Sequence, residues 1–221
     1  MARSAAQSTQ RYPLTTILGA EANVRLLREL SRHGGQLSAP LLVARSGLGK
    51  TSVWAALATL EGIHIVASAG TGRARLYRIR TDHPLFAPLD ALFDAEEARF
   101  TAIREAVRSA ASGSGPGVLA VWVYGSVARG EDRPDSDLDV AVVAQPAELA
   151  RIVDALRDAL LVPGEKLGFV PSVIGLDPDD VERLSRERDP WWTGVAADAM
   201  VLLGSRPDEM ARWARDGEAA A

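Results

Sequence analysis

The chain has 221 residues, of which 47% are hydrophobic and 24% charged, a balance typical of a folded globular protein. It contains no cysteine, which excludes disulfides and thiolate metal sites and gives no indication of secretion. The sequence shows neither a signal-peptide pattern nor an apolar run of about 20 residues. We therefore expect a cytoplasmic protein that does not enter a membrane.

The net charge of −4 hides an uneven distribution along the chain. Residues 1–84 hold 11 Lys and Arg against 4 Asp and Glu, whereas residues 85–221 hold 14 against 25. A basic first third suits a polyanion such as DNA. An acidic remainder would be repelled by bare phosphates unless metal ions intervene. A solvated basic surface without any partner explains the first count equally well.

Residues 12–84 are predicted to form one small domain that begins with two helices. Apolar residues at helical spacing mark Glu21 to His33 as the first helix. A second, short helix is expected to begin at Ser38, whose hydroxyl can cap it. We expect Leu41 and Leu42 of this helix to face the core.

A turn, a third helix and a hairpin complete this domain. The helix is predicted from about Gly49 to Leu60, with its apolar residues facing inward. Two β-rich segments, Ile63 to Val66 and Arg75 to Ile79, flank a glycine-containing turn, which is a hairpin signal.

From Leu37 to Ile79 this order resembles the winged helix-turn-helix transcription regulators of prokaryotes. The resemblance implies double-stranded DNA as a partner, because the start of a recognition helix meets base edges and wing arginines reach phosphates or the minor groove. Winged helices also serve as protein-interaction modules, which is the alternative. The candidate DNA-binding residues are Lys50, Thr51 and Ser52 in the recognition helix and Arg73 and Arg75 in the wing.

Residues 85–117 are expected to connect two domains through a long helix, Pro88 to Ala111, and a glycine–serine linker, Ser112 to Gly117. The helix carries an apolar stripe that includes Leu89 and Phe93. Such a stripe packs either on the helix's own domain or against a second copy of the chain. We favour the second interpretation, which gives a homodimer.

Residues 118–221 are predicted to form a domain of the α/β (α+β) class, a small mixed sheet flanked by helices. Strands are expected at Val118 to Tyr124, around Leu138 to Val143, and at Phe169 to Leu176. An amphipathic helix is predicted from Glu148 to Leu161, and the chain after Asp179 is expected to be mostly helical.

The first of these strands ends in Tyr124-Gly125-Ser126, immediately before an expected helix. A strand that ends this way places free backbone N–H groups and a hydroxyl where a phosphate can bind. Glycine lets the backbone approach a ligand closely, because any side chain would block it.

Asp137 and Asp139 lie two residues apart on a probable strand, so both carboxylates are expected on one face. Two neighbouring carboxylates repel each other unless a cation lies between them, and hard oxygen ligands favour Mg²⁺. Metal ions that bridge triphosphate oxygens would stabilise charge during an in-line phosphoryl displacement.

Gly-Ser-x-x-Arg-Gly followed by Ser-Asp-x-Asp resembles the signature of the DNA polymerase β-like nucleotidyltransferases, especially the minimal prokaryotic kind. The resemblance extends from about Val118 to Gly204. It implies a nucleoside triphosphate as ligand and Mg²⁺ as cofactor, and it implies that Arg129 braces the turn. The implied site residues are Asp137 and Asp139 as catalytic metal ligands, with Gly125, Ser126 and Ser136 contacting the nucleotide.

One departure from the family pattern bears on turnover. Active members usually carry a third carboxylate on a later strand, and the position that aligns with it here is Ser172. A serine can help hold water but cannot serve as a carboxylate base or metal anchor. Asp177 is close in sequence, but it has the opposite strand parity and should point away. Nucleotide binding is therefore expected, and turnover stays open.

The leading interpretation is a DNA-binding protein whose second domain binds Mg²⁺ with a nucleoside triphosphate and transfers a nucleotidyl group. The sequence does not identify the acceptor. One rival is a transcription regulator in which a catalytically spent domain only senses nucleotide, and another is a toxin–antitoxin component that regulates its own promoter. The missing third acid favours the sensor, whereas the intact Gly-Ser and acid pair favour transfer.

Overall fold

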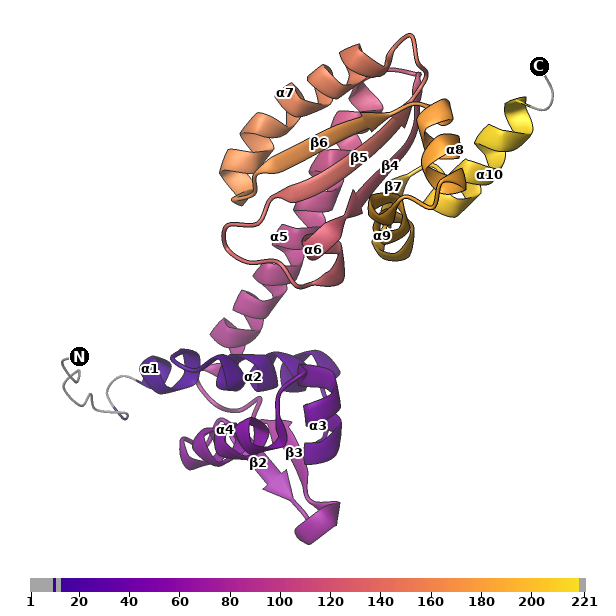
Figure 1. Ribbon diagram of the computed structural model, residues 1–221. Helices are drawn as coiled ribbons and strands as arrows, with labels where there is room; N and C mark the ends of the chain where they lie inside the picture. Colours follow the sequence, from indigo (N-terminus) through magenta and orange to yellow (C-terminus); the bar gives the residue numbers. More distant parts are fainter. Residues whose placement is uncertain (1–9, 11–12, 219–221) are drawn as a thin grey trace, which may run out of the picture. The chain divides into compact units, whose positions relative to one another are not determined.

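The structure is a computed structural model that describes residue 10 and residues 13–218. The chain divides into two compact units, Met1–Glu97 and Ala98–Ala221. Figure 1 shows the elements of both units coloured along the sequence. None of the described helices combines the length and apolarity that a membrane span requires.

The first unit combines helices with a small antiparallel sheet of order β1-β3-β2. The helices and the hairpin follow one another in the predicted order, and a two-residue strand, β1, that the sequence did not indicate pairs with β3. The elements are α1 (Pro13–Leu18), α2 (Glu21–His33), β1 (Leu37–Ser38), α3 (Ala39–Ser46), α4 (Lys50–Gly62), β2 (Val66–Ala69), the 3-10 turn η1 (Gly72–Ala74) and β3 (Leu76–Ile79).

The short helix α3 buries only one of the two leucines expected in the core. The Ser38 hydroxyl caps the helix by accepting the Leu41 N–H at 3.4 Å, as predicted. Leu42 is fully buried, but Leu41 is 45% exposed. Successive residues in a helix point about 100° apart, and here only the direction of Leu42 is covered by the core.

The strand predicted at Ile63 to Val66 begins only at its last residue. Helix α4 continues to Gly62, and the chain then turns through His64, which has a left-handed φ of 62°. Ile65 is fully buried in this turn. An apolar segment can reach the core from a turn as well as from a strand, which is why its composition was misleading.

Helix α5 (Phe86–Gly113) is a single long helix, as predicted, and the division between the two units lies within it. Its apolar stripe packs into the chain's own cores, which is the first of the two alternatives above. Leu89 and Phe93 belong to the core of the first unit, and Ile103 and Val107 belong to the core of the second. Leu92 of the same stripe is 54% exposed, so the homodimer stays a prediction.

The glycine–serine stretch lies within the second unit rather than between the units. Ser114 is buried, and its hydroxyl donates to the Ala110 carbonyl at 2.8 Å. Its own carbonyl accepts a hydrogen bond from Arg151 at 2.9 Å. These contacts hold a segment whose composition is typical of a flexible linker.

The second unit is built on a mixed sheet of order β6-β5-β4-β7, which confirms the predicted class. Strand β5 (Leu138–Ala144) pairs antiparallel with β4 (Val118–Tyr124) and parallel with β6 (Pro171–Leu176). A fourth strand, β7 (Met200–Leu203), pairs antiparallel with β4 in the part expected to be mostly helical.

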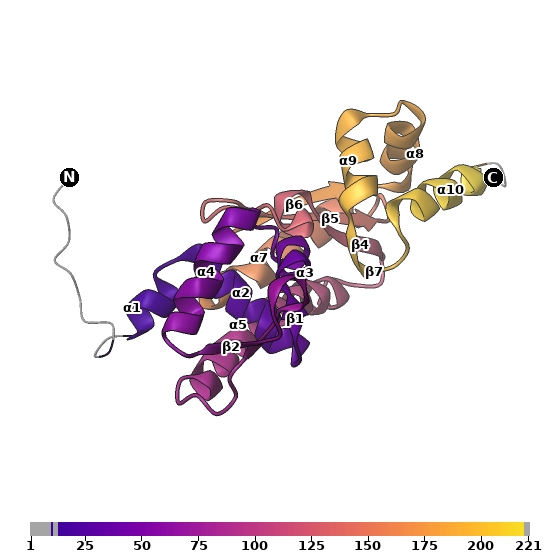
Figure 2. The same cartoon turned by 90° about the horizontal axis from the view of Figure 1, so that it is seen from below.

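Helices cover both faces of this sheet (Figure 2). Helices α5 and α7 (Leu149–Leu167) pack on one face, and α8, α9 and α10 pack on the other. Helix α7 was predicted to end at Leu161 but continues through Pro163, although an interior proline removes one N–H and crowds the preceding turn, and it closes at Gly168 with a φ of 69°. The remaining helices are α6 (Gly125–Arg129), α8 (Pro178–Arg186), α9 (Pro190–Asp198) and α10 (Pro207–Glu218).

Candidate functional site

Asp139 lies at the start of the central strand β5, between two neighbouring strands. It is directly opposite Tyr124 of β4 and Ser172 of β6. The residues on either side of it, Leu138 and Val140, enter the core under α5 and α7. By strand alternation, Asp139 therefore faces the side of the sheet that α8, α9 and α10 cover.

Two carboxylates influence each other at this point, although Asp137 lies just before β5 and not within the strand predicted to hold both. Burial raises the pKa of Asp139 above its ordinary value, and the negative charge of Asp137 raises it further. A hydrogen bond from the Ser172 hydroxyl and the positive charge of Arg129 act in the opposite direction. Asp137 itself is exposed. The two negative charges therefore repel each other, and a bound cation would reduce this repulsion.

Gly125, the first residue of α6, lies directly against the Asp139 carboxylate. Its φ is 74°, and a Cβ built there would lie 2.5 Å from Asp139 Oδ2. Only glycine allows this backbone conformation and this approach together. The next residue, Ser126, is half-buried, and its carbonyl accepts the Glu131 N–H at 2.9 Å, which closes the turn after α6. The structure therefore joins the Gly-Ser segment to the acid pair.

The model of the family described as "Polymerase beta, Nucleotidyltransferase" matches residues 109–169. These residues form a nucleotidyltransferase-like domain. The matched range contains Gly125, Ser126 and both aspartates, and it ends before β6.

Three solved structures were also found to be similar. A toxin–antitoxin crystallised with AMP-PNP is 14% identical, with a TM-score of 0.33, over 53% of this chain and 87% of that one. The antimony-specific transcriptional repressor AntR is 28% identical, with a TM-score of 0.34, over 43% of this chain and 88% of that one. A mutant of the toxin–antitoxin MntA-HpeT is 12% identical, with a TM-score of 0.34, over 53% and 87%. The comparison with curated proteins returned no match.

The position that the sequence analysis aligned with a third acid lies on β6, beyond the matched residues. Ser172 lies beside Asp139 in the parallel register of β5 and β6, and its hydroxyl lowers the pKa of that carboxylate. Asp177 is engaged elsewhere, because its carboxylate accepts the Asp180 N–H at 2.8 Å and caps α8. In the part of the chain that the structure describes, no three His, Cys, Asp or Glu residues are grouped as metal ligands.

An aromatic pair beside the acids was not anticipated from the sequence. Tyr124, opposite Asp139, meets Trp191 of α9 edge to face, with ring centroids 5.5 Å apart. The Trp191 indole donates a hydrogen bond to the Tyr124 hydroxyl, while burial and the charge of Asp139 raise the pKa of Tyr124. The 66 residues between Tyr124 and Trp191 left no local signal of their contact.

Two further residues of the nucleotidyltransferase-like domain hold its loops. Arg129 forms ion pairs with Glu131 at 2.8 Å and with Asp198 of α9 at 2.5 Å, which fits the bracing role expected for it. The Ser136 hydroxyl accepts the Arg133 N–H at 2.9 Å and closes the loop before β5. Ser136 can still donate its own proton to a ligand.

In the first unit, the candidate DNA-binding residues differ in exposure and in whether they already form ion pairs. Lys50, Thr51 and Ser52 are exposed in the first turn of α4. Arg75, by contrast, forms a bidentate pair with Glu61 at 2.7 and 2.9 Å, so a phosphate would have to compete with that carboxylate. The Arg73 side chain lies outside what the structure describes.

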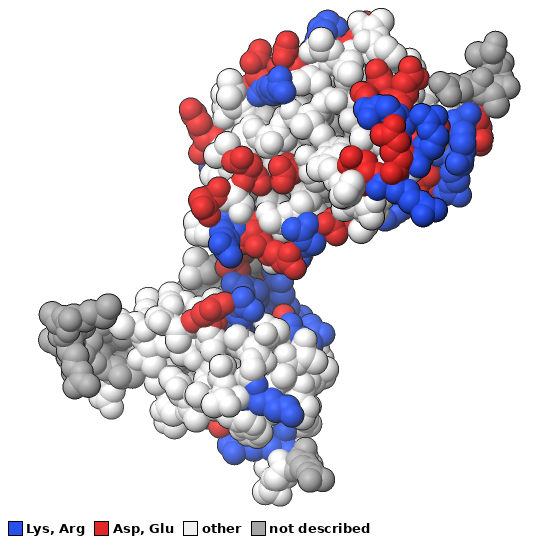
Figure 3. Space-filling model, viewed as in Figure 1, with Lys and Arg blue, Asp and Glu red and all other residues white. Residues whose placement is uncertain are grey.

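Ion pairs neutralise much of the basic charge that composition assigns to the first unit. Among the side chains that the structure describes there, Lys50 and Arg78 are the cations without an ion-pair partner. On the face shown in Figure 3, the charged side chains of the first unit are more often Lys and Arg than Asp and Glu, whereas the second unit displays both signs. The pairs are Arg25 with Glu21, Arg28 with Glu96, Arg32 with Glu97, Arg45 with Glu29, Arg75 with Glu61, and Arg80 with Asp82.

Proposed function

We propose that the nucleotidyltransferase-like domain binds a nucleoside triphosphate together with Mg²⁺. Asp137 and Asp139 are the metal ligands, and Gly125, Ser126 and Ser136 lie along the phosphates. The close approach of Gly125 to Asp139 carries this proposal: a Cβ built on the glycine would lie 2.5 Å from Asp139 Oδ2, so the backbone at the start of α6 lies beside the acid pair. Carboxylate oxygens are ligands that suit Mg²⁺. When bound, the ion would neutralise the acid pair and bridge to phosphate oxygens.

The environment of Asp139 favours nucleotide sensing over efficient transfer. A third carboxylate would be needed to anchor a second metal ion or accept the proton of an attacking hydroxyl. Ser172 occupies that place, and its hydroxyl lowers the pKa of Asp139. Nucleotidyl transfer is the second candidate function, and the intact Gly-Ser segment and acid pair support it.

We further propose that the first unit is a winged helix-turn-helix that binds double-stranded DNA. Three helices followed by an antiparallel hairpin support this assignment. The exposed first turn of α4, with Lys50, Thr51 and Ser52, is the surface proposed to meet base edges in the major groove. The whole chain would then be a DNA-binding regulator that responds to nucleotide.

Calorimetry with each of the four ribonucleoside triphosphates tests nucleotide binding. We expect binding that requires Mg²⁺ and is lost in Asp137→Ala, whereas Asp135→Ala, an exposed acid in the same loop, leaves it intact. Binding that survives both EDTA and Asp137→Ala would refute the assignment of the metal ligands.

Triphosphates labelled at the α-phosphate separate sensing from transfer. The wild type should bind label without moving it to protein, RNA or small-molecule acceptors. Ser172→Asp adds a carboxylate beside Asp139, so this variant should bind Mg²⁺ more tightly and gain transfer. Rapid transfer by the wild type, abolished in Asp139→Ala, would establish the enzyme instead of the sensor.

A further inference from the structure

A cavity of about 760 Å³ opens in the second unit on the side of the sheet that α5 covers. Its lining includes Ile103 and Leu138, which belong to the core between the sheet, α5 and α7. Asp139, the next residue along β5, faces the other side of the sheet. Neither aspartate and neither residue of the Gly-Ser pair lines the cavity. Of the residues proposed above to hold the triphosphate, only Ser136 also lines it.

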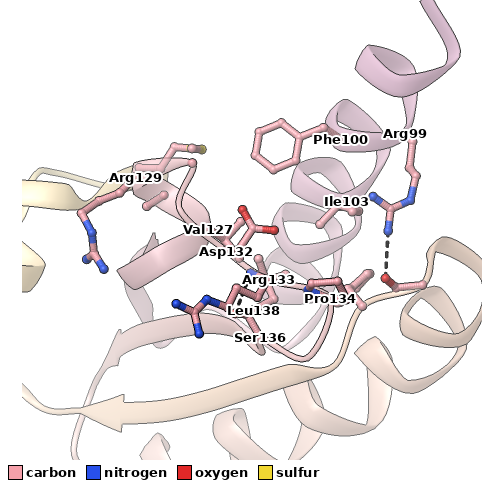
Figure 4. A pocket seen from close by; sticks show the side chains of 15 residues that line it. Arg99, Phe100, Ile103, Val127, Arg129, Asp132, Arg133, Pro134, Ser136 and Leu138 are labelled. Atoms are coloured by element: carbon pink, nitrogen blue, oxygen red, sulfur yellow. Dashed lines mark hydrogen bonds between the residues drawn. The ribbon is translucent and has the colours of Figure 1, made fainter. Parts of the chain in front are cut away.

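The cavity combines aromatic, acidic and cationic side chains. Phe100 of α5 and Phe169 after α7 contribute its aromatic surface. The Asp132 carboxylate points into the space between Phe100 and the loop before β5 (Figure 4). Among the described residues, Asp132 has no hydrogen-bond or ion-pair partner. An unpaired carboxylate beside phenyl rings calls for a ligand that offers both hydrogen-bond donors and a flat apolar surface.

Arg99 provides the positive charge at the opposite wall. One of its amino groups, Nη2, donates to the Gly168 carbonyl at 2.8 Å, which fixes the side chain and leaves its other N–H donors free (Figure 4). Arg129 and Arg133 also line the cavity, but in Figure 4 their side chains extend away from Arg99. The wall formed by Arg99 is thus suited to one anionic group.

We propose that this cavity binds a nucleoside monophosphate as a second nucleotide, separate from the one proposed at the acid pair. The base would lie against Phe100 and Phe169, the ribose hydroxyls or a base amino group would donate to Asp132, and the phosphate would accept from Arg99. Aromatic side chains stack on any base, and acidic residues commonly hold ribose hydroxyls. The volume lies within the roughly 300–1,000 Å³ of small-molecule sites. This site needs no metal and does not depend on the function proposed above.

Fluorescence anisotropy with methylanthraniloyl derivatives of AMP and GMP tests this site. The measurement is made in EDTA, because the site proposed at the acid pair cannot bind nucleotide without Mg²⁺. Asp132→Asn should weaken binding about 10-fold, from the loss of hydrogen bonds to a charged group. Phe100→Ala should weaken it by a similar factor, from the loss of base stacking. Asp135→Asn is the matched control, because Asp135 is an exposed acid of the same loop that does not line the cavity.

Four outcomes decide the proposal. Metal-free binding that falls in Asp132→Asn and persists in Asp137→Asn/Asp139→Asn supports it, even if Mg²⁺-dependent triphosphate binding proves absent. Stronger binding of a labelled trinucleotide than of AMP would identify the end of a nucleic-acid strand as the source of the same chemistry. Absence of metal-free binding in the wild type overturns the proposal, and so does equal affinity of Asp132→Asn and Asp135→Asn. Because Asp132 is exposed, this comparison does not depend on the folding of Phe100→Ala.

Discussion

Replacing Gly125 by alanine tests whether the position of the Asp139 carboxylate determines nucleotide affinity, apart from any loss of fold stability. The new Cβ would lie 2.5 Å from Asp139 Oδ2, whereas ordinary contact begins near 3.4 Å. The carboxylate must therefore retreat by about 1 Å, while metal sites tolerate displacements of only about 0.2 Å. We expect the Mg²⁺-dependent affinity for triphosphate to fall at least about 10-fold, the size of effect that disturbing a ligand's supporting shell produces.

The same substitution strains the backbone, and Gly130→Ala provides the control for that strain. Gly130, just after α6, has a φ of 69°, close to the 74° of Gly125, but a Cβ there meets nothing within 4 Å. Each variant should lose about 1 kcal/mol of unfolding free energy, because an L side chain in this conformation costs about 1–2 kcal/mol. Urea denaturation followed by tryptophan fluorescence measures this loss, since four of the five tryptophans lie in the second unit.

The two variants should thus match in stability and differ in ligand affinity. If Gly130→Ala weakens triphosphate binding as much as Gly125→Ala does, the effect comes from the strained backbone and the contact with Asp139 is irrelevant to binding. If neither variant weakens it, the acid pair is not the metal site.

Three further perturbations test other parts of the reasoning. Folding raises the pKa of Asp139 above its ordinary value of 3.8. Just above pH 3.8 the folded chain therefore keeps a proton on Asp139 that the unfolded chain has released. The free energy of unfolding consequently falls as the pH rises through this range. Asp139→Asn removes this loss and should be more stable than the wild type at pH 7 without Mg²⁺; a lower urea midpoint would contradict the pKa direction. Lys50→Ala should weaken DNA binding and reduce its salt slope by about 1, whereas Arg45→Ala, which removes a partner of Glu29, should not. An unchanged slope in a salt titration would count against placing α4 in the groove. Arg129→Ala should leave triphosphate affinity unchanged, and a clear loss in calorimetry would show that Arg129 contacts the ligand.

The residues of the candidate site could be predicted from sequence because they follow one another along the chain. Asp137 and Asp139 are two residues apart, although β5 begins only at Leu138 between them, and Gly125 and Ser126 follow directly from β4. The alignment also predicted Ser172 as the substitute for a third acid, and the register of β5 and β6 places it beside Asp139.

Features that depend on contacts between distant segments could not be predicted in this way. Trp191 reaches Tyr124 because α9 packs on the sheet, which no local pattern in either segment indicates. The positive charge of the first unit was overestimated because the count stopped at residue 84. The unit extends to Glu97 and includes four more acids, of which Glu96 and Glu97 pair with Arg28 and Arg32.

Composition was also a poor guide to where the chain can be divided. Because α5 supplies Ile103, Val107 and Ala111 to the second core, a protease cut or a truncation at Ser112–Gly117 would leave that core's sheet without one of its covering helices. A fragment that begins at Ala98 keeps all three residues. A cut, fusion or recombination of this protein should therefore be placed inside helix α5. The glycine–serine stretch is unsuitable, although its composition is typical of a linker.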